Sequence, residues 1–200
     1  GLGESSPYAI PGWTADVHHP RVGVPVLWWR SVGHTHTGYA TEVFLDMVLE
    51  AQGKDPVQGR LDLLKSDRGR DRGVLEKVAE MAGWDGTRVK GDKAYGVAVH
   101  ESFETYVAQV AEVSVADGRI RVHRVVCAVD CGLVINPDIV RAQMEGSIAF
   151  GLSAALKQRI SYKDGHIEQD NFHNYQMLRM NEMPEVEVSI EIDQPPVFSP

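Results

Sequence analysis

The hydrophobic pattern of this chain changes its period near Gly86, and that change limits the folds available to it. Before Gly86, apolar residues recur three and four positions apart, as at Phe44, Met47 and Val48, which is the spacing of one helix face. After it, segments such as EVEVSIEI alternate strictly between polar and apolar residues, as half-buried strands do. Helices followed by hairpins, a further helix and a strand predict an α+β fold in which helices pack on a mixed sheet.

Three helices are expected before Gly86. The first covers residues 41–52, after a loop formed by HTHTG at residues 34–38. The second opens with Asp55 as the N-cap and Pro56 in the first turn, a combination typical of helix starts. The third covers about residues 74–82.

Hairpins are expected in the second part of the chain. Asp117-Gly118 is a strong two-residue turn signal, and the arm that follows it has a bulge at His123-Arg124. Residues 125–129 are apolar on both faces, which predicts a central, covered strand. A second hairpin is expected around Asp164-Gly165, and EVEVSIEI is expected to be an edge or half-buried strand.

The clearest helix signal lies after Asn136, which acts as the N-cap for a helix of about twenty residues that begins at Pro137. Gln143, Gly146 and Phe150 share one face of this helix because they are three and four residues apart. Two interpretations stay open. The face can admit a ligand close to the backbone, or its glycines can admit a neighbouring strand.

A segment with an unusual mixture of side chains, VLWWRSVGHTHTG, lies before the first helix. Its first part, within GVPVLWWRSV, is a strand candidate, so Trp28 and Trp29 would point to opposite faces and only one of them would line a site. Arg30, between an aromatic residue and a glycine turn, normally bonds an anion or a polar ligand. This turn and the helix of Gln143 therefore predict a pocket for a large, polar, planar molecule.

Two other kinds of site are weaker candidates in the same segment. His34 and His36 would share one face of a strand and could bind a metal with Glu42 and Asp46, but no third ligand follows at a characteristic spacing. Ser31 with one of these histidines could form a nucleophile and its base, but the Gly-x-Ser-x-Gly elbow that exposes such a serine is missing.

Composition excludes several classes of function. The net charge of −8 and the isoelectric point of about 5.4 disfavour a nucleic-acid partner, which requires a basic face. No apolar run approaches the roughly 20 residues that span a bilayer, so no transmembrane segment is expected. The two cysteines, Cys127 and Cys131, are expected to be free thiols because a zinc site would need two more ligands.

Three blocks in the same order resemble the molybdopterin-binding subunit of the xanthine dehydrogenase/aldehyde oxidase family, in its isoquinoline 1-oxidoreductase β-subunit branch. The first runs from VLWWRSVGHTHTG to the GKDPVQGRLDLL helix. The second is VVCAVDCGLVINPDIVRAQMEG, and the third is NFHNYQMLRMNEMPEVEV. The similarity covers roughly residues 7–193.

The resemblance implies a part of a molybdenum hydroxylase that oxidises an aldehyde or an N-heteroaromatic substrate with oxygen from water. It implies molybdopterin, in the cytosine dinucleotide form, and a small [2Fe–2S] subunit that takes the electrons. It also implies an arm at residues 1–21 and a fragment of the molybdopterin-binding domain at residues 22–200. Within that fragment, the helical part would lie at about 38–83 and the hairpin, helix and strand part at about 92–193. Cellular location stays open.

The family pattern also indicates which residues meet the cofactor. No catalytic residue and no metal ligand is expected within this chain, because the base glutamate and the phosphate loops of the family would lie outside it. The isolated chain is thus expected to be inactive and to lack the cofactor, and the alternative is a non-catalytic interaction module that keeps the fold. The residues expected to bind the cofactor are Trp29, Arg30, Ser31, Val32, Gly33, Gln143 and Gly146. Where purine-oxidising relatives would have glycine and an aromatic residue, this chain has Ser31 and Val32, which argues against a purine substrate.

Overall fold

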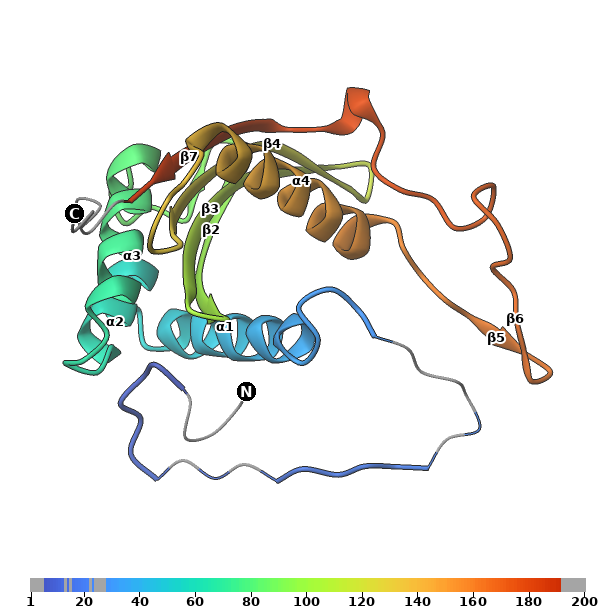
Figure 1. The fold of residues 1–200 in the computed structure, drawn as a ribbon, viewed down its shortest axis with the longest axis horizontal. Helices are drawn as coiled ribbons and strands as arrows, with labels where there is room; N and C mark the ends of the chain where they lie inside the picture. Colours follow the sequence, from blue (N-terminus) through green and yellow to red (C-terminus); the bar gives the residue numbers. More distant parts are fainter. Residues whose placement is uncertain (1–5, 13, 15, 22, 24–27, 192–200) are drawn as a thin grey trace, which may run out of the picture.

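The computed structural model describes residues 6–12, 14, 16–21, 23 and 28–191. Its centre is a five-stranded sheet in the order β1-β2-β3-β4-β7, with β7 parallel to β4 and the other pairs antiparallel (Figure 1). The fold is therefore α+β with a mixed sheet, as predicted. The elements are α1 (His34–Ala51), α2 (Pro56–Leu63), α3 (Gly69–Ala82), β1 (Val89–Lys90), β2 (Lys93–Ser102), β3 (Thr105–Ala116), β4 (Arg119–Asp130), α4 (Pro137–Leu156), β5 (Tyr162–Lys163), β6 (His166–Ile167), the 3-10 helix η1 (Met180–Glu182) and β7 (Glu185–Ile190).

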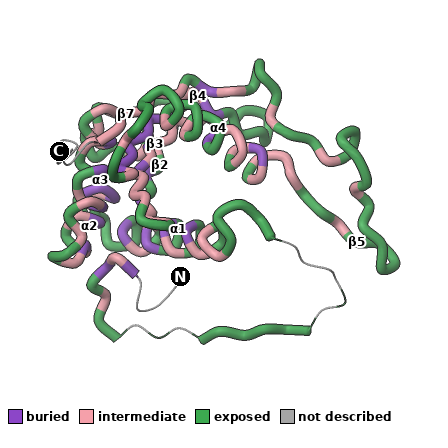
Figure 2. Tube along the Cα trace, viewed as in Figure 1, coloured by how far each residue is buried: buried purple, intermediate pink, exposed green. Residues whose placement is uncertain are grey.

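Helices cover both faces of the sheet. On one face, Val74, Leu75 and Val78 of α3 pack with Leu49 of α1 against apolar residues of β2, β3 and β4. On the other, Ile148 of α4 packs with side chains of β4 and β7. Figure 2 shows these buried positions concentrated in the sheet and on the inner faces of the helices. Among the described residues, no helix combines the length and the apolar composition needed to cross a bilayer.

The residue types at turns and helix starts predicted these features of the fold correctly. Asp117 and Gly118 both have positive φ, at 52° and 70°, and they join β3 to β4. The register skips His123, because Glu112 pairs with Arg124 and Val113 pairs with Val122, so the predicted bulge is confirmed. β4 lies between β3 and β7 with residues 125–130 buried, as a central strand does. The predicted helix caps at Asp55 and Asn136 and the hairpin at Asp164-Gly165 are also present.

Two predicted boundaries were wrong. HTHTG is the first turn of α1 and not a loop, because the Thr37 hydroxyl bonds the Gly33 carbonyl at 2.8 Å and Gly38 packs closely on the His100 ring. Similarly, α3 begins at Gly69 inside a charged segment that was expected to be a loop. Residues 24–27 of the strand expected in GVPVLWWRSV lie outside the described residues; Trp28 and Trp29, which are described, belong to no strand.

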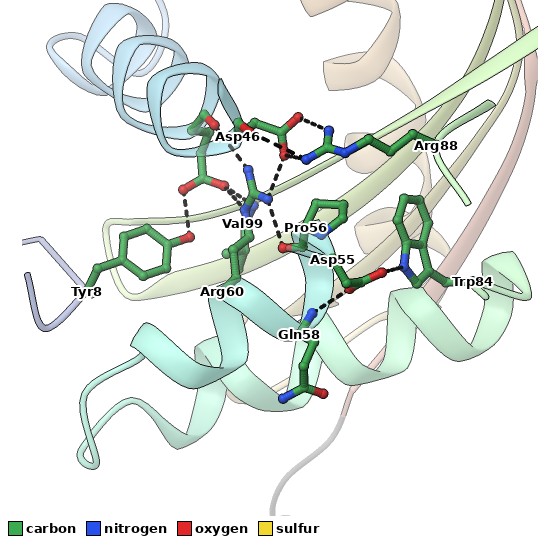
Figure 3. Close-up of polar contacts among 10 residues, drawn as sticks. Tyr8, Asp46, Asp55, Pro56, Gln58, Arg60, Trp84, Arg88 and Val99 are labelled. Atoms are coloured by element: carbon green, nitrogen blue, oxygen red, sulfur yellow. Dashed lines mark hydrogen bonds and ion pairs between the residues drawn. The ribbon is translucent and has the colours of Figure 1, made fainter. Parts of the chain in front are cut away.

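A buried ion network joins α1, α2 and the N-terminal arm (Figure 3). Arg60 is fully buried and donates hydrogen bonds to Glu42, Asp46 and two backbone carbonyls. Glu42 also accepts hydrogen bonds from the Tyr8 hydroxyl at 2.7 Å and from the backbone N–H of Val99 at 3.0 Å. Burial raises the pKa of Tyr8, so its hydroxyl keeps its proton. One carboxylate thus joins the arm, α2 and the edge of β2.

Both cysteines are free, as expected from the sequence. Cys127 is buried on β4, and Cys131 is partly exposed after it. Burial raises the pKa of the Cys127 thiol to about 11, so this side chain behaves as a small apolar residue. Of the two cysteines, Cys127 therefore belongs to the core of the sheet.

Candidate functional site

The segment from Arg30 to Gly33 forms a tight turn with a strained backbone. Ser31 and Val32 have φ angles of 63° and 50°, a region that a β-branched residue rarely adopts. Two backbone hydrogen bonds hold the turn, from Val32 N to Trp29 O at 3.0 Å and from His34 N to Ser31 O at 2.9 Å. The Arg30 carbonyl accepts hydrogen bonds from the hydroxyls of Ser31 and Thr35. Such strain persists only where the surrounding contacts impose it, and it gathers at ligand sites.

This turn contacts α4 through a single aromatic side chain. The ring centre of Phe150 lies 5.1 Å from that of Trp29, in a tilted arrangement. The guanidinium carbon of Arg30 lies 5.4 Å from the centre of the same ring. Aromatic and cation–π contacts at these separations are attractive. The two segments singled out in the sequence are thus brought together.

A cavity of about 1020 Å³ opens between the turn, α1, the end of β2 and α4. Its size suits a large ligand. Arg30 and His36 are its basic side chains, and none of the residues that line it is acidic. The residues that line it are Trp29, Arg30, Ser31, Thr35, His36, Tyr39, Ser102, Phe103, Thr105, Ser147, Phe150, Gly151, Ala154 and Ala155.

The polar groups of this cavity fit a polar or anionic ligand. Among the described residues, the Arg30 guanidinium has no hydrogen-bond or ion-pair partner. The Ser102 hydroxyl at the cavity wall is buried and also lacks a hydrogen-bond partner in the described part of the chain. The buried Ser102 hydroxyl is costly unless a ligand or water bonds it, and the exposed guanidinium is free to bond a ligand. The arrangement therefore agrees with the predicted pocket for a large polar molecule.

Gln143 and Gly146 lie on the exposed side of α4 and do not line the cavity. Gln143 is four residues before Ser147 and seven before Phe150, so it continues the cavity-facing stripe of the helix toward its N-terminus. A Cβ added at Gly146 or Gly151 would meet no described atom within 4 Å. The interpretation in which these glycines admit a neighbouring strand is therefore wrong for the described chain, and open space remains beside the helix.

The alternative sites in the segment do not assemble. His34 and His36 lie on a helix and not on a strand, so they point apart: His34 contacts His100, with 3.0 Å between Nδ1 and Nε2, and His36 faces the cavity. The Ser31 hydroxyl bonds the Arg30 carbonyl and Thr35, and no hydrogen bond to a histidine is present. Among the described residues, no group of three potential metal ligands occurs.

Sequence reasoning missed the side of the cavity formed by β2 and β3. Phe103 and Glu104 make the turn between these strands, with φ angles of 52° and 62°. Neither residue type signals such a turn, so the sequence pattern gives no boundary between these two strands. Tyr39 was also missed, because α1 was expected to begin at residue 41.

Similarity to known proteins decides the family of this chain. The molybdopterin cofactor-binding domain matches residues 47–184. The chain belongs to this family. The match includes α2, α3, the sheet strands up to β4 and the whole of α4.

Two relatives and one solved structure place the family membership in context. The isoquinoline 1-oxidoreductase subunit beta of Brevundimonas diminuta is 37% identical over 96% of this chain and 25% of its own length. The membrane-bound aldehyde dehydrogenase [pyrroloquinoline-quinone] of Gluconacetobacter polyoxogenes is 32% identical over 80% of this chain and 23% of its own length. A crystal structure of Cu,Mo-CO dehydrogenase covers 46% of this chain and 12% of its own, at 24% identity and a TM-score of 0.42. The chain thus spans about a quarter of the length of these curated relatives.

Proposed function

We propose that this chain forms one wall of the cofactor cleft of a molybdenum-dependent oxidoreductase that oxidises an aldehyde or an N-heteroaromatic compound with oxygen from water. The contact of the Arg30 turn with Phe150 carries the proposal, because it brings this turn to one cavity with α4, a helix of the matched molybdopterin cofactor-binding domain. The names of the relatives, which include an isoquinoline oxidoreductase and an aldehyde dehydrogenase, support this substrate class.

Each proposed contact follows from a chemical property of the residue. Arg30 donates hydrogen bonds to oxygen atoms of the cofactor from a guanidinium that has no other described partner. Ser31, Val32 and Gly33 offer their backbone groups to the cofactor. The conformation of their turn is fixed before the cofactor binds. Trp29 stabilises that turn through the contact of its ring with the Phe150 ring. None of these groups carries out redox chemistry, which the molybdenum of the cofactor supplies when bound.

The exposed stripe of α4 extends the same cleft. The Gln143 side chain supplies an amide donor and acceptor, and Gly146 leaves the backbone of the helix accessible to a flat ligand. We further propose that the cofactor is the cytosine dinucleotide form and that a small [2Fe–2S] subunit accepts the electrons. Because the chain spans about a quarter of its relatives, the chain alone is expected to be inactive.

The test uses the longer protein that contains this chain, produced with its neighbouring subunit. Molybdenum and cytosine nucleotide are measured after release of the cofactor, and dye reduction is measured with aldehydes and with N-heterocycles. Stoichiometric molybdenum and substrate-dependent dye reduction are expected. The 200-residue chain, purified in parallel, is expected to hold no stoichiometric molybdenum.

Other outcomes would refute the proposal in distinct ways. Activity that depends on pyrroloquinoline quinone without molybdenum would assign a different cofactor. A folded protein without either cofactor and without dye reduction would indicate the non-catalytic interaction module. Stoichiometric molybdenum on the 200-residue chain would contradict the expected need for the remaining segments.

A further inference from the structure

One side of β4 is only partly covered by a neighbouring strand. β7 pairs with β4 from Arg124 to Val129, and β3 pairs with it along its whole length. Over residues 119–123, no described strand lies on the side of β7. The segment before β7 does not continue the pairing along this edge, because Pro184 lacks an N–H group and η1 precedes it. The edge is thus open where β7 would otherwise continue.

The main-chain groups along this edge point outward at every second residue. Asp117 and Gly118 form a two-residue turn, so the flanking residues Ala116 and Arg119 face each other across the hairpin. Antiparallel pairs alternate between those that exchange hydrogen bonds and those that do not. The alternation leaves the N–H and C=O of Ile120 and Val122 directed away from β3. These groups can bond an added strand.

A row of arginines follows the same edge. Val122 and Val125 belong to the core beneath α4, so Arg121 and Arg124 project from the opposite face, where Arg124 bonds the Met81 carbonyl of α3. Arg124 forms an ion pair with Glu187 of β7 at 2.6 Å. By the same alternation, Arg119 projects beside Arg121. Neither Arg119 nor Arg121 has a hydrogen-bond or ion-pair partner among the described residues.

A groove of about 920 Å³ runs along the open edge. Its other wall is the segment from Gln176 to Pro184, in which the Gln176 and Asn181 side chains have no described hydrogen-bond partner. The Glu182 carboxylate, also in this wall, is already occupied by Lys157 and by the Arg179 N–H. The groove therefore offers free donors and cations but no free carboxylate.

We infer that residues 119–123 of β4 are a docking edge for an extended peptide segment in which acidic and apolar residues alternate. β7 shows how β4 binds such a segment: Glu187 meets Arg124, while Val186 and Val188 pack into the core beneath α4. A further strand of the same pattern places carboxylates on Arg119 and Arg121 and apolar side chains beside Ile120 and Val122. None of residues 119–123 lines the proposed cofactor cleft, and the groove and the cleft share only Ala155 of α4 among their lining residues.

The test measures binding of the synthetic peptide Glu-Val-Glu-Val-Glu-Val to the 200-residue chain by fluorescence anisotropy. Saturable binding that weakens with salt is expected. The double variant Arg119→Glu/Arg121→Glu is expected to lower the affinity by about tenfold or more, because it replaces attraction by repulsion. The double variant Lys54→Glu/Lys163→Glu, an exposed change of equal charge outside the groove, serves as the control and should bind normally. Circular dichroism checks that each variant is folded.

Three further peptides separate strand addition from simple charge attraction. A peptide with Gln in place of Glu should bind at least about tenfold more weakly. The Glu-Val peptide N-methylated at alternate residues, in two versions with opposite phase, should lose binding in the phase that blocks the edge. Equal binding of both methylated peptides to the unmodified chain would overturn the inference. So would equal competition by inorganic pyrophosphate, or self-association of the chain through this edge that excludes the peptide.

Discussion

The guanidinium of Arg30 rests on the ring of Phe150, with 5.4 Å from the guanidinium carbon to the ring centre. Arg30 belongs to the strained turn before α1, and Phe150 belongs to the second half of α4. Because Trp29 contacts the same ring at 5.1 Å, Phe150 determines where both side chains of the turn lie. Substitutions of Arg30 can therefore test ligand binding, and substitutions of Trp29 and Phe150 can test what holds the turn in place.

Arg30→Ala in the longer enzyme should lower turnover by about tenfold or more while changing the melting temperature little. The guanidinium is exposed and forms no described ion pair, so its removal costs little folding free energy. Turnover and thermal unfolding are measured on the same preparation, with Lys54→Ala as an exposed control. A proportionate loss of both quantities would make Arg30 a structural residue.

Trp29 and Phe150 should be energetically coupled. In a double-mutant cycle of Trp29→Ala and Phe150→Ala, urea unfolding of the chain should give a coupling free energy of about 0.5–1.5 kcal/mol, which is typical of aromatic pairs. The pair Trp28 and Phe150 is a matched control, because Trp28 is 91% exposed and makes no described aromatic contact. Strict additivity for Trp29 and Phe150 would mean that the turn does not rest on α4 in solution.

Features of the fold that depend on local chemistry were predictable. Asp55 and Asn136 cap helices because their side chains accept hydrogen bonds from the first turn, and Asp117-Gly118 tolerates positive φ. The bulge at His123 was predictable because two polar residues interrupted an apolar alternation. In each case the determining interaction lies within a few residues of the signal.

Features that depend on distant contacts were not predictable from pattern alone. The turn at Phe103-Glu104 has no glycine or asparagine, and its positive φ angles are imposed by the pairing of β2 with β3. The contact of Arg30 with Phe150 joins segments far apart in sequence; the side chains of the two segments predicted a shared pocket, but no local signal paired Arg30 with Phe150. Likewise, nothing local marks Arg60 as the most deeply buried cation of the described chain.

Arg60→Ala should be among the most destabilising substitutions in this chain. It leaves Glu42 buried beside Tyr8 without its cation, and such losses cost about 3–5 kcal/mol. Urea unfolding followed by circular dichroism measures the effect. Arg141→Ala is the matched control, because its ion pair with Asp138 is exposed and contributes less than about 0.5 kcal/mol. An equal loss of unfolding free energy in the two variants would show that water reaches the network around Arg60.

Asp71 should make the chain less stable as pH rises from about 4 to about 6. This residue is fully buried in the first turn of α3, and neither carboxylate oxygen has a described hydrogen-bond partner. Burial raises its pKa from 3.8 to about 6, although Arg68 opposes the change. Well below pH 4 the carboxyl is protonated in both the folded and unfolded states. Between the two pKa values the unfolded state loses its proton first, which favours unfolding, and above about pH 6 the effect is complete.

The expected size of this effect is about 3 kcal/mol at most, because one pKa unit is worth about 1.4 kcal/mol. Other carboxylates act in the opposite direction; Arg70, for example, lowers the pKa of Asp130. The measured quantity is therefore the difference in unfolding free energy between Asp71→Asn and the unmodified chain. It should grow in favour of the variant between pH 4 and pH 6, whereas Asp138→Asn, in the first turn of α4, controls for the loss of one exposed charge. A constant difference across this interval would mean that a partner, such as Arg68 or water, keeps the Asp71 carboxylate ionised in the folded chain.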